Sequence, residues 1–354
     1  MKRAVVLCML TIAGCNSYDC DDPCVDHVTD VDRRDPQIAT ANGRTLIAWT
    51  SAGGVDGRWL DEGDAQTLVE RVDGRPFAMA SDGQDALIGW EDSAGTLDLQ
   101  LASAAAPTAL APLHGHLGVA QLAMAFDGDG YVVAWVDDNR LNLARVASDG
   151  TVLESQTLAT EAVTVVVSVD AAGAVIAWTD PAPRAIVGRA AGLPVHAVEG
   201  GQGAALSCAA AGCVFATAVG ADLTVEQLDM QLQPIGTSTI DAGSRLGDFA
   251  VAGSPTRHAI AWFVESDAGA TSSLLAQVFD GAYGPTQVLG PSAPLPGEQL
   301  FLTGQLASAE HDGTLDLIWT TDSERATHDT VRSRFELVRT LLQRDGHTPP
   351  ATFE

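Results

Sequence analysis

The sequence predicts an all-β protein, a seven-bladed β-propeller of four-stranded antiparallel blades. Two observations predict it: an apolar run ending in tryptophan recurs along the chain, and a short turn with glycine precedes almost every copy. The copies recur about every 40–45 residues, which is the spacing of propeller blades. Helical periodicity is missing over any useful length. The one exception, FELVRTLL at 335–342, fits a pair of strands equally well.

The tryptophan run is the clearest repeated element. A seventh copy, at 212–217, has Thr217 in the tryptophan position, and successive copies are 41, 45, 43, 39, 45 and 57 residues apart. The runs are apolar at consecutive positions, as in strands that are covered on both faces. We therefore expect core tryptophans that fill the space between blades, namely Trp49, Trp90, Trp135, Trp178, Trp262 and Trp319.

The segments around each run complete a four-stranded unit. In the third repeat, LAMAF at 122–126 is followed by the turn DGDG and then by the run that ends at Trp135. Such turns between apolar runs indicate hairpins, because Gly and Asn tolerate positive φ. A loop, the alternating strand LNLARV at 141–146 and a second Asp-Gly turn come next. Each repeat therefore predicts four short antiparallel strands.

The first residues have the layout of an export signal. Lys2 and Arg3 precede an apolar run at 4–13 that is too short to span a bilayer. Gly14 and Cys15 follow, and Ile-Ala-Gly-Cys resembles the bacterial lipobox. The resemblance implies that the thiol of Cys15 carries a diacylglycerol, and several acyl chains hold a protein firmly on a membrane. An ordinary cleaved signal with a chance cysteine is the alternative.

The lipobox resemblance also implies a location in the cell envelope. Asn16 stands where an Asp favours retention in the inner membrane of enteric-type bacteria, so the outer membrane is expected. Whether the protein faces the periplasm or the cell surface is left open.

Together these features divide the chain into four segments. They are a signal peptide at 1–14, an acidic tether at 15–35, the propeller at 36–342 and a flexible tail at 343–354. The tether is an alternative source of a strand that closes the ring. The long last separation implies an insertion near 291–299.

Four cysteines remain once Cys8 is assigned to the signal and Cys15 to the lipid. An even number fits disulfides in an oxidising compartment. Zinc is the alternative, but the spacings C-x3-C and C-x4-C lie far apart and have no clustered His beside them. We expect disulfides, and no metal, from Cys20, Cys24, Cys208 and Cys213.

One pairing can be predicted from the repeat itself. Aligning the fifth repeat with the third at the tryptophan position places Cys208 on Phe126 and Cys213 on Tyr131. These positions flank a four-residue turn in both repeats, so they should face each other across a hairpin. Opposed residues of that kind lie within disulfide range. The sequence thus predicts a Cys208–Cys213 disulfide in the fifth blade.

The charge excludes one class of partner. The formal net charge is −27, and Lys2 is the single lysine of the chain. So acidic a surface repels phosphate backbones, which excludes nucleic acid and disfavours docking onto anionic lipid through charge. We expect a monomer that meets the membrane through its N-terminal lipid.

Motifs for catalysis or metal binding are weak. Neither G-x-S-x-G nor H-E-x-x-H occurs. Asp127 and Asp129 give two of the carboxylates of a calcium loop, so a turn is the preferred interpretation. His114 and His116 have a chelating spacing but no third ligand that can be named. No cofactor is expected.

A set of aspartates recurs two residues after the tryptophans. An acidic ring that binds a cation or a basic ligand is one interpretation, and capping of the turn after each strand is the preferred one. The set is Asp92, Asp137 and Asp180.

The repeat resembles the Trp-containing propeller repeats of bacterial surface lipoproteins, over most of the chain and best at 122–158. The resemblance implies a propeller displayed on a membrane. We expect a binding or interaction scaffold, with an envelope protein or a glycan as its ligand and with no catalytic residue. Two alternatives stay open: an enzyme that hydrolyses or cleaves glycans at the propeller mouth, and an accessory in outer-membrane assembly.

Overall fold

The computed structural model describes residues 34–352 apart from short gaps, the longest of which is 289–298. From residue 299 onward it describes the strands and how they pair. No helix in the described part of the chain could cross a membrane. Several predictions fall outside the described residues, namely those for Cys15, Cys20, Cys24, His114 and His116.

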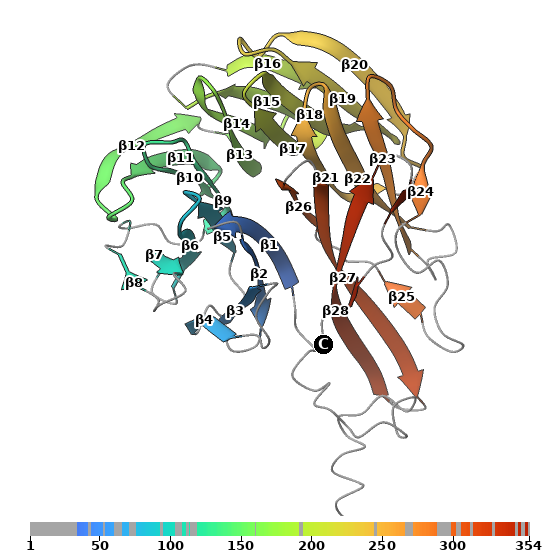
Figure 1. Ribbon diagram of the computed structural model, residues 1–354, viewed down its shortest axis with the longest axis horizontal. Helices are drawn as coiled ribbons and strands as arrows, with labels where there is room; N and C mark the ends of the chain where they lie inside the picture. Colours follow the sequence, from blue (N-terminus) through green and yellow to red (C-terminus); the bar gives the residue numbers. More distant parts are fainter. Residues whose placement is uncertain are drawn as a thin grey trace, which may run out of the picture.

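The described strands form seven antiparallel sheets, numbered here in chain order (Figure 1). Sheet 1 has β1 (Arg34–Ala41), β2 (Arg44–Ser51), β3 (Gly54–Trp59) and β4 (Gln66–Glu70). Sheet 2 has β5 (Phe77–Ser81), β6 (Ala86–Glu91), β7 (Leu97–Ala102) and β8 (Thr108–Ala109). Sheet 3 has β9 (Val119–Phe126), β10 (Tyr131–Asp137), β11 (Arg140–Val146) and β12 (Val152–Ala159).

The next three sheets repeat this order. Sheet 4 has β13 (Thr164–Asp170), β14 (Gly173–Asp180), β15 (Arg184–Arg189) and β16 (Pro194–Glu199). Sheet 5 has β17 (Gly201–Ala209), β18 (Gly212–Val219), β19 (Asp222–Leu228) and β20 (Pro234–Asp241). Sheet 6 has β21 (Leu246–Ser254), β22 (Arg257–Glu265), β23 (Ser272–Asp280) and β24 (Gln287–Val288).

The sheets surround a common centre, with their first strands innermost (Figure 1). Each first strand contacts the first strand of the next sheet, from β1 through β5, β9, β13, β17 and β21 to β26. The circle closes because β26 (Leu306–His311), in sheet 7, also contacts β1. The tryptophan run forms the second strand, which pairs with a strand on each side.

The core lies between neighbouring sheets. Trp135 packs in one apolar cluster with Ala78 of the preceding sheet, and Trp178 packs in the next cluster with Ala134. At these two interfaces one sheet presents a large ring and the facing sheet presents a small residue. This alternation lets adjacent sheets approach and fills the space between them. The described tryptophans Trp49, Trp90, Trp135, Trp178 and Trp262 are buried accordingly, apart from a small exposed fraction.

Sheet 7 differs from the expected four-stranded blade. It has six described strands, and two of them, β27 (Thr314–Thr327) and β28 (Thr330–Gln343), are 14 residues long. No Gly or Pro lies between Trp319 and Thr330, so no turn stops the pairing soon after the tryptophan. The remaining strands are β25 (Gln299–Phe301), β26, β29 (Gly346–His347) and β30 (Ala351–Thr352).

Sheet 7 bears on two expectations about the segments at the ends of the propeller. The described strands of sheet 7 all come from residues 299–352, so none of them is contributed by the tether at 15–35. The short strands β29 and β30 lie within the segment at 343–354 that was expected to be a flexible tail.

Candidate functional site

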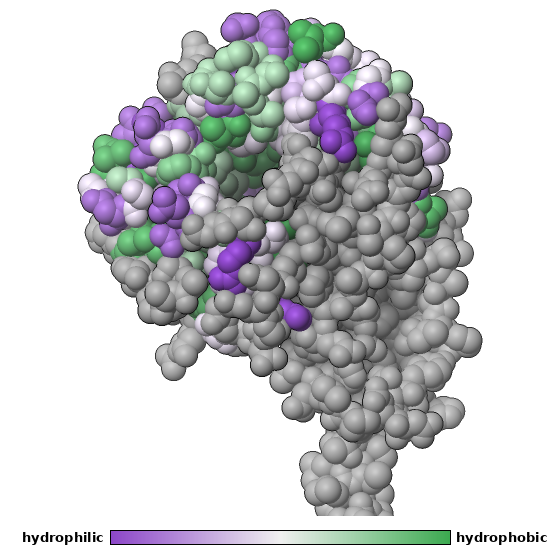
Figure 2. Space-filling model, viewed as in Figure 1, coloured by the Kyte–Doolittle hydropathy of each residue, from purple (hydrophilic) through white to green (hydrophobic). Residues whose placement is uncertain are grey.

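A central cavity is the candidate site. It has a volume of about 580 Å³ and is lined by the first strands of sheets 1 to 6. Among the described strands, each of these pairs with the second strand of its own sheet alone, so no described strand pairs with its other edge. A free strand edge carries backbone N–H and C=O groups that can bind a ligand. Figure 2 shows a hollow in the middle of the face in view, with apolar side chains on part of its wall.

Three polar side chains lie at equivalent positions on the cavity wall. Gln121, Thr164 and Asp248 each directly precede the residue that pairs with the tryptophan of their sheet. They stand at or near the beginning of β9, β13 and β21, and Gln121 and Asp248 are exposed. We call these three residues the polar rim.

The described part of the cavity wall carries little charge. Asp248 is the one ionisable residue among the described residues that line the cavity. Most of the other lining residues are apolar, and several of these are only half-buried, such as Ile38, Val166, Leu206 and Phe249. Within the described lining, an apolar wall is thus combined with polar groups and one carboxylate.

β-bulges reshape the inner strands at this same end. The pairing shifts at Arg34/Gln37 in β1, near Gln121 in β9, at Gln202/Ala205 in β17 and at Leu246/Phe249 in β21. A bulge puts an extra residue into one strand and re-aims its side chains. Asp248 is one of the extra residues, and its Oδ1 accepts a hydrogen bond from the backbone N–H of Phe249 at 2.9 Å.

The bulge in sheet 5 depends on a glycine. Gly203 has a φ of +69°, in the left-handed region that other residues rarely adopt. A Cβ there would lie 3.1 Å from Cε1 of Phe249 in the next sheet. The backbone of β17 and the Phe249 ring therefore meet closely at the cavity wall.

Glycan hydrolysis of the usual kind uses two carboxyl groups on either side of the bond that breaks. The described lining contributes one, that of Asp248. No group of three or more His, Cys, Asp or Glu that could hold a metal occurs within the described residues.

The predicted aspartate set does not meet in a ring site. Asp92 closes its own hairpin, since its Oδ1 accepts the Thr96 N–H at 2.7 Å. Asp180 forms an ion pair with Arg184 across the turn after β14. Asp137 is the last residue of β10 and pairs in register with Arg140. These contacts agree with the preferred interpretation as residues that stabilise turns.

Asp127 also acts in a turn. Its Oδ1 accepts the backbone N–H groups of Asp129 and Gly130, at 3.2 and 3.1 Å. Its Oδ2 forms an ion pair with Arg145 at 2.6 Å. The arrangement fits the turn that was preferred over a calcium loop.

The Cys208–Cys213 disulfide is confirmed. The two residues are register partners in β17 and β18, with Cα atoms 4.0 Å apart. In sheet 3 the equivalent partners Phe126 and Tyr131 place their ring centroids 5.1 Å apart. Sheet 5 therefore has a covalent link where sheet 3 has an aromatic pair.

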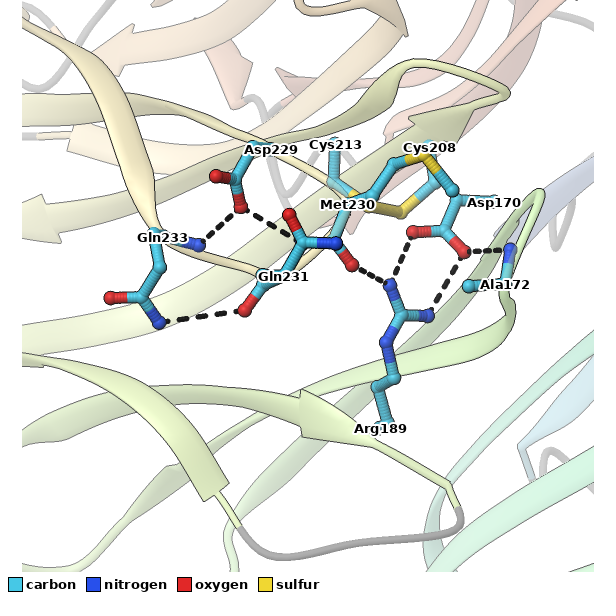
Figure 3. Close-up of polar contacts among 9 residues, drawn as sticks. All are labelled: Asp170, Ala172, Arg189, Cys208, Cys213, Asp229, Met230, Gln231 and Gln233. Atoms are coloured by element: carbon cyan, nitrogen blue, oxygen red, sulfur yellow. Dashed lines mark hydrogen bonds and ion pairs between the residues drawn. A yellow bond between two sulfur atoms is a disulfide. The ribbon is translucent and has the colours of Figure 1, made fainter.

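A polar network joins sheets 4 and 5 close to this disulfide (Figure 3). Arg189 of β15 donates to both carboxylate oxygens of Asp170, at 2.9 and 2.7 Å, and also to the carbonyl oxygen of Met230. Asp229 shapes the turn that holds Met230, since its Oδ1 accepts the N–H groups of Gln231 and Gln233, each at 2.9 Å. The network fixes the neighbouring sheets relative to each other.

Sequence reasoning missed a buried histidine in sheet 6. His258 donates from Nδ1 to the Ser254 carbonyl at 3.1 Å, and its Nε2 accepts from the Tyr283 hydroxyl at 2.9 Å. Its ring stacks on Phe279 with centroids 4.7 Å apart. Burial lowers the pKa of His258 to about 4, so it is neutral at pH 7. Its place at the start of a tryptophan run, equivalent to that of Tyr131, was the available signal.

Comparison with known structures identifies the fold class. No protein-family model matches the sequence, and no curated protein matches it. A chain of the mitotic checkpoint complex matches with a TM-score of 0.54 and 13% identity, over 86% of this chain and 89% of that one. AofleA from Arthrobotrys oligospora matches with a TM-score of 0.50 and 10% identity, over 92% and 88%. The SapL1 lectin, in complex with alpha methyl fucoside, matches with a TM-score of 0.47 and 10% identity, over 91% and 96%.

The first two of these structures are β-propellers. At such low identities the likeness shows the fold alone. The predicted all-β propeller class is therefore confirmed, and this chain is a β-propeller.

Proposed function

We propose that this protein is a binding scaffold whose ligand enters the central cavity. One observation carries the proposal: the inner strands of six sheets, far apart in the sequence, converge on a cavity that has a polar rim and an apolar wall. Ligand sites are typically concave and apolar, with a few polar groups that orient the ligand. The bulges at the same end support this assignment, since bulges are frequent beside functional sites.

Affinity capture tests this function. The full mature chain is incubated with envelope extracts and a glycan panel, beside a Gln121→Ala/Asp248→Asn variant. Binding at the cavity predicts that capture falls sharply in the variant, while a control with Asp129→Asn, at the other end of sheet 3, captures as the wild type does. If the rim variant captures as much as the wild type does, the ligand binds elsewhere on the propeller. Recovery of the barrel-insertion machinery would favour the role in outer-membrane assembly.

We further propose that the scaffold is a lipoprotein held on the outer membrane through Cys15. The support is the sequence 1–15, in which a basic start, an apolar run, small residues and a cysteine follow in order. Cys15→Ser should move the protein from the membrane fraction to the soluble fraction and remove the mass of the lipid. Cys8→Ser is the matched control and should fractionate as the wild type does. A Cys15→Ser variant that stays with the membrane would disprove this anchor.

A further inference from the structure

We propose that the long hairpin of sheet 7 binds the phosphate group of a small phosphorylated compound, on the face that carries Arg325, Arg332 and Arg334. We call this side of the hairpin the arginine face. The site lies outside the central cavity, so the inference goes beyond the proposed function and does not depend on it. Three features carry it: the length of the hairpin, the register that collects the arginines, and the positions of the described carboxylates.

The hairpin reaches beyond the rest of its sheet. In sheet 3 the second strand, β10, ends at Asp137, two residues after Trp135, whereas β27 continues from Trp319 to Thr327. Its partner β28 stays in register with it over this whole length. Figure 1 shows β27 and β28 extending away from the ring of sheets. Among the described strands, β25 pairs with β27 only as far as Glu324, so the hairpin beyond it is a two-stranded ribbon.

The register puts three arginines on one face of this ribbon. Residues directly opposite each other in an antiparallel pair share a face, and so do residues two apart along a strand. Arg325 is opposite Arg332, and Arg334 follows two positions later, opposite Ser323. Opposed Cα atoms lie about 5 Å apart, and Cα atoms two residues apart along a strand lie about 7 Å apart. The three positions are therefore close enough to serve one anion together.

This arrangement of arginines opposes folding unless an anion joins it. Like charges directly opposite each other on a sheet are destabilising. Acidic residues outnumber basic ones by 46 to 19 in the chain, so its composition favours an acidic residue, rather than a second arginine, opposite Arg325. An anion bound at the Arg325–Arg332 pair would replace this repulsion with attraction to both residues.

The described carboxylates of the ribbon lie mainly on its other face. Asp322 and Glu324 are each an odd number of positions from Arg325, so the pleat places them on the opposite side. On the arginine face, the described positions around the Arg325–Arg332 pair hold hydroxyl residues and one arginine, namely Ser323, Thr327, Thr330 and Arg334. Glu336 is the nearest described carboxylate on that face, further toward the body of the sheet. Within the described strands, the arginine face thus combines positive charge with hydroxyl groups, and both suit an oxyanion.

The surrounding charge limits the size of the anion. Arginine binds phosphate through paired N–H groups, and arginine clusters recur in the recognition of phosphorylated ligands. A nucleic acid or an anionic lipid surface would also approach the rest of a chain whose formal net charge is −27. Salt screens this repulsion beyond about 8 Å, so a small anion on the arginine face meets much less of it than an extended one does. A small phosphorylated compound is therefore favoured.

Probes that share one skeleton test the ligand class. Glycerol phosphate, glycerate and glycerol differ in the charge of one end, and inorganic phosphate supplies the anion alone. Isothermal titration of the full mature chain near pH 7 measures the affinity for each. We expect glycerol phosphate and inorganic phosphate to bind at least tenfold more tightly than glycerol, with glycerate in between, because the arginines respond to the charge of the anion. Raised sodium chloride should weaken phosphate binding.

Two variants locate the effect. Arg325→Gln/Arg332→Gln should weaken the binding of glycerol phosphate about tenfold, as the loss of two exposed ion pairs would give. Arg339→Gln is the matched control, because Arg339 pairs with Ile318 on the other face of the same hairpin, and it should bind as the wild type does. Urea denaturation separates binding from folding. Without a ligand the double variant should be at least as stable as the wild type, because the opposed charges are gone. Glycerol phosphate should raise the denaturation midpoint of the wild type and leave that of the double variant unchanged.

Several outcomes would overturn the inference. They are equal binding of glycerol phosphate and glycerol, unchanged binding in Arg325→Gln/Arg332→Gln, or an equal loss in Arg339→Gln. A lipid surface as the true partner would show as binding of the Cys15→Ser chain to vesicles of phosphatidylglycerol, but not of phosphatidylcholine, without binding of glycerol phosphate. The rim variant Gln121→Ala/Asp248→Asn should bind glycerol phosphate as the wild type does. Failure of the proposed function and failure of this inference are therefore distinguishable.

Discussion

Thr217 donates a hydrogen bond from Oγ1 to the carbonyl oxygen of Gly203, at 2.8 Å, in the one repeat that has no tryptophan. The side chain is fully buried. Threonine replaces tryptophan here because the space between sheets 4 and 5 is too narrow. A Cβ at Gly201 would lie 2.7 Å from Cβ of Ala185 and 2.8 Å from Oγ1 of Thr217, so β17 runs too close to sheet 4 for an indole. Threonine fits there and also satisfies a carbonyl that the bulge leaves outside the ladder.

We therefore expect Thr217→Val to destabilise the protein although the shape is kept. The variant leaves the Gly203 carbonyl without this donor, which costs about 1–3 kcal/mol of the free energy of unfolding. Thr217→Trp should cost more, because it overfills the close approach between sheets 4 and 5. Urea denaturation measures both. The exposed Thr237→Val in β20 is the control and should be nearly neutral; a Thr217→Val as stable as this control would contradict the assignment.

The disulfide should stabilise sheet 5 by a modest amount. Closing so short a loop restricts the unfolded chain by about 2 kcal/mol on the chain-entropy account. A Cys208→Ala/Cys213→Ala variant should lose this much, shown by a lower denaturation midpoint. Reductant should lower the midpoint of the wild type and have less effect on the variant. If both proteins unfold at the same midpoint under oxidising conditions, the link contributes nothing to stability.

His258 should make the fold sensitive to acid. Its pKa is lowered from 6.5 to about 4 by burial, so between these values the unfolded chain binds a proton that the folded chain does not. Stability that is fully present above pH 6.5 is then lost as the pH falls through 6.5 toward 4. The loss attributable to this residue is about 3 kcal/mol at the acid end.

The measurement is denaturation at a series of pH values for the wild type and for His258→Phe. Phenylalanine can stack on Phe279 but carries no proton. The carboxylates titrate alike in both proteins, so the difference between the two curves reports His258. The difference should change between pH 6.5 and 4 and stay constant above this window. Parallel curves throughout would show that the pKa of His258 is the same in the folded and the unfolded chain.

Arg189 should contribute more to stability than Arg145, although both pair with the first-hairpin aspartate of their own sheet. The side chain of Asp170 has no exposed surface, whereas that of Asp127 is 9% exposed. Arg189 also binds the Met230 carbonyl of sheet 5. Arg189→Ala should therefore cost about 2–4 kcal/mol, because it leaves a buried charge without its partner.

Arg145→Ala is the matched control and should cost about 1 kcal/mol, as expected for a more exposed pair. Thermal unfolding of the two variants compares them directly. The double variant Asp170→Asn/Arg189→Ala should recover part of the loss, because no unpaired carboxylate remains. Equal melting temperatures for the two single variants would show that neither the deeper burial of Asp170 nor the link to Met230 adds stability.

Local sequence patterns determined most of the fold. The repeated order of apolar segment, turn and tryptophan run predicted the hairpins, because a turn with Gly fixes the pairing of the strands beside it. The same reasoning predicted a contact between two particular residues in sheet 5. Cys208 and Cys213 flank a turn of the same length as Phe126 and Tyr131 do, so their contact follows from the alignment alone.

The tertiary structure decided the site. Gln121, Thr164 and Asp248 are ordinary polar residues in the sequence, 43 and 84 positions apart, and none of them was predicted. Each of them directly precedes the residue that pairs with the tryptophan of its sheet, and this shared position in the repeat was a signal that could have been used. They share one cavity because the ring closes, and closure depends on how every sheet packs on the next.

Bulges mark the limit of what the sequence by itself determines. A bulge shifts the register by one residue and so changes which side chains share a face, while the apolar pattern that predicts the strand stays almost the same. Asp248 lines the cavity beside Phe249 through such a shift, and Gly203 meets Phe249 through another. The sequence therefore determined the repeating unit. The packing of one unit against the next decided where Asp248 lies and which residues line the cavity with it.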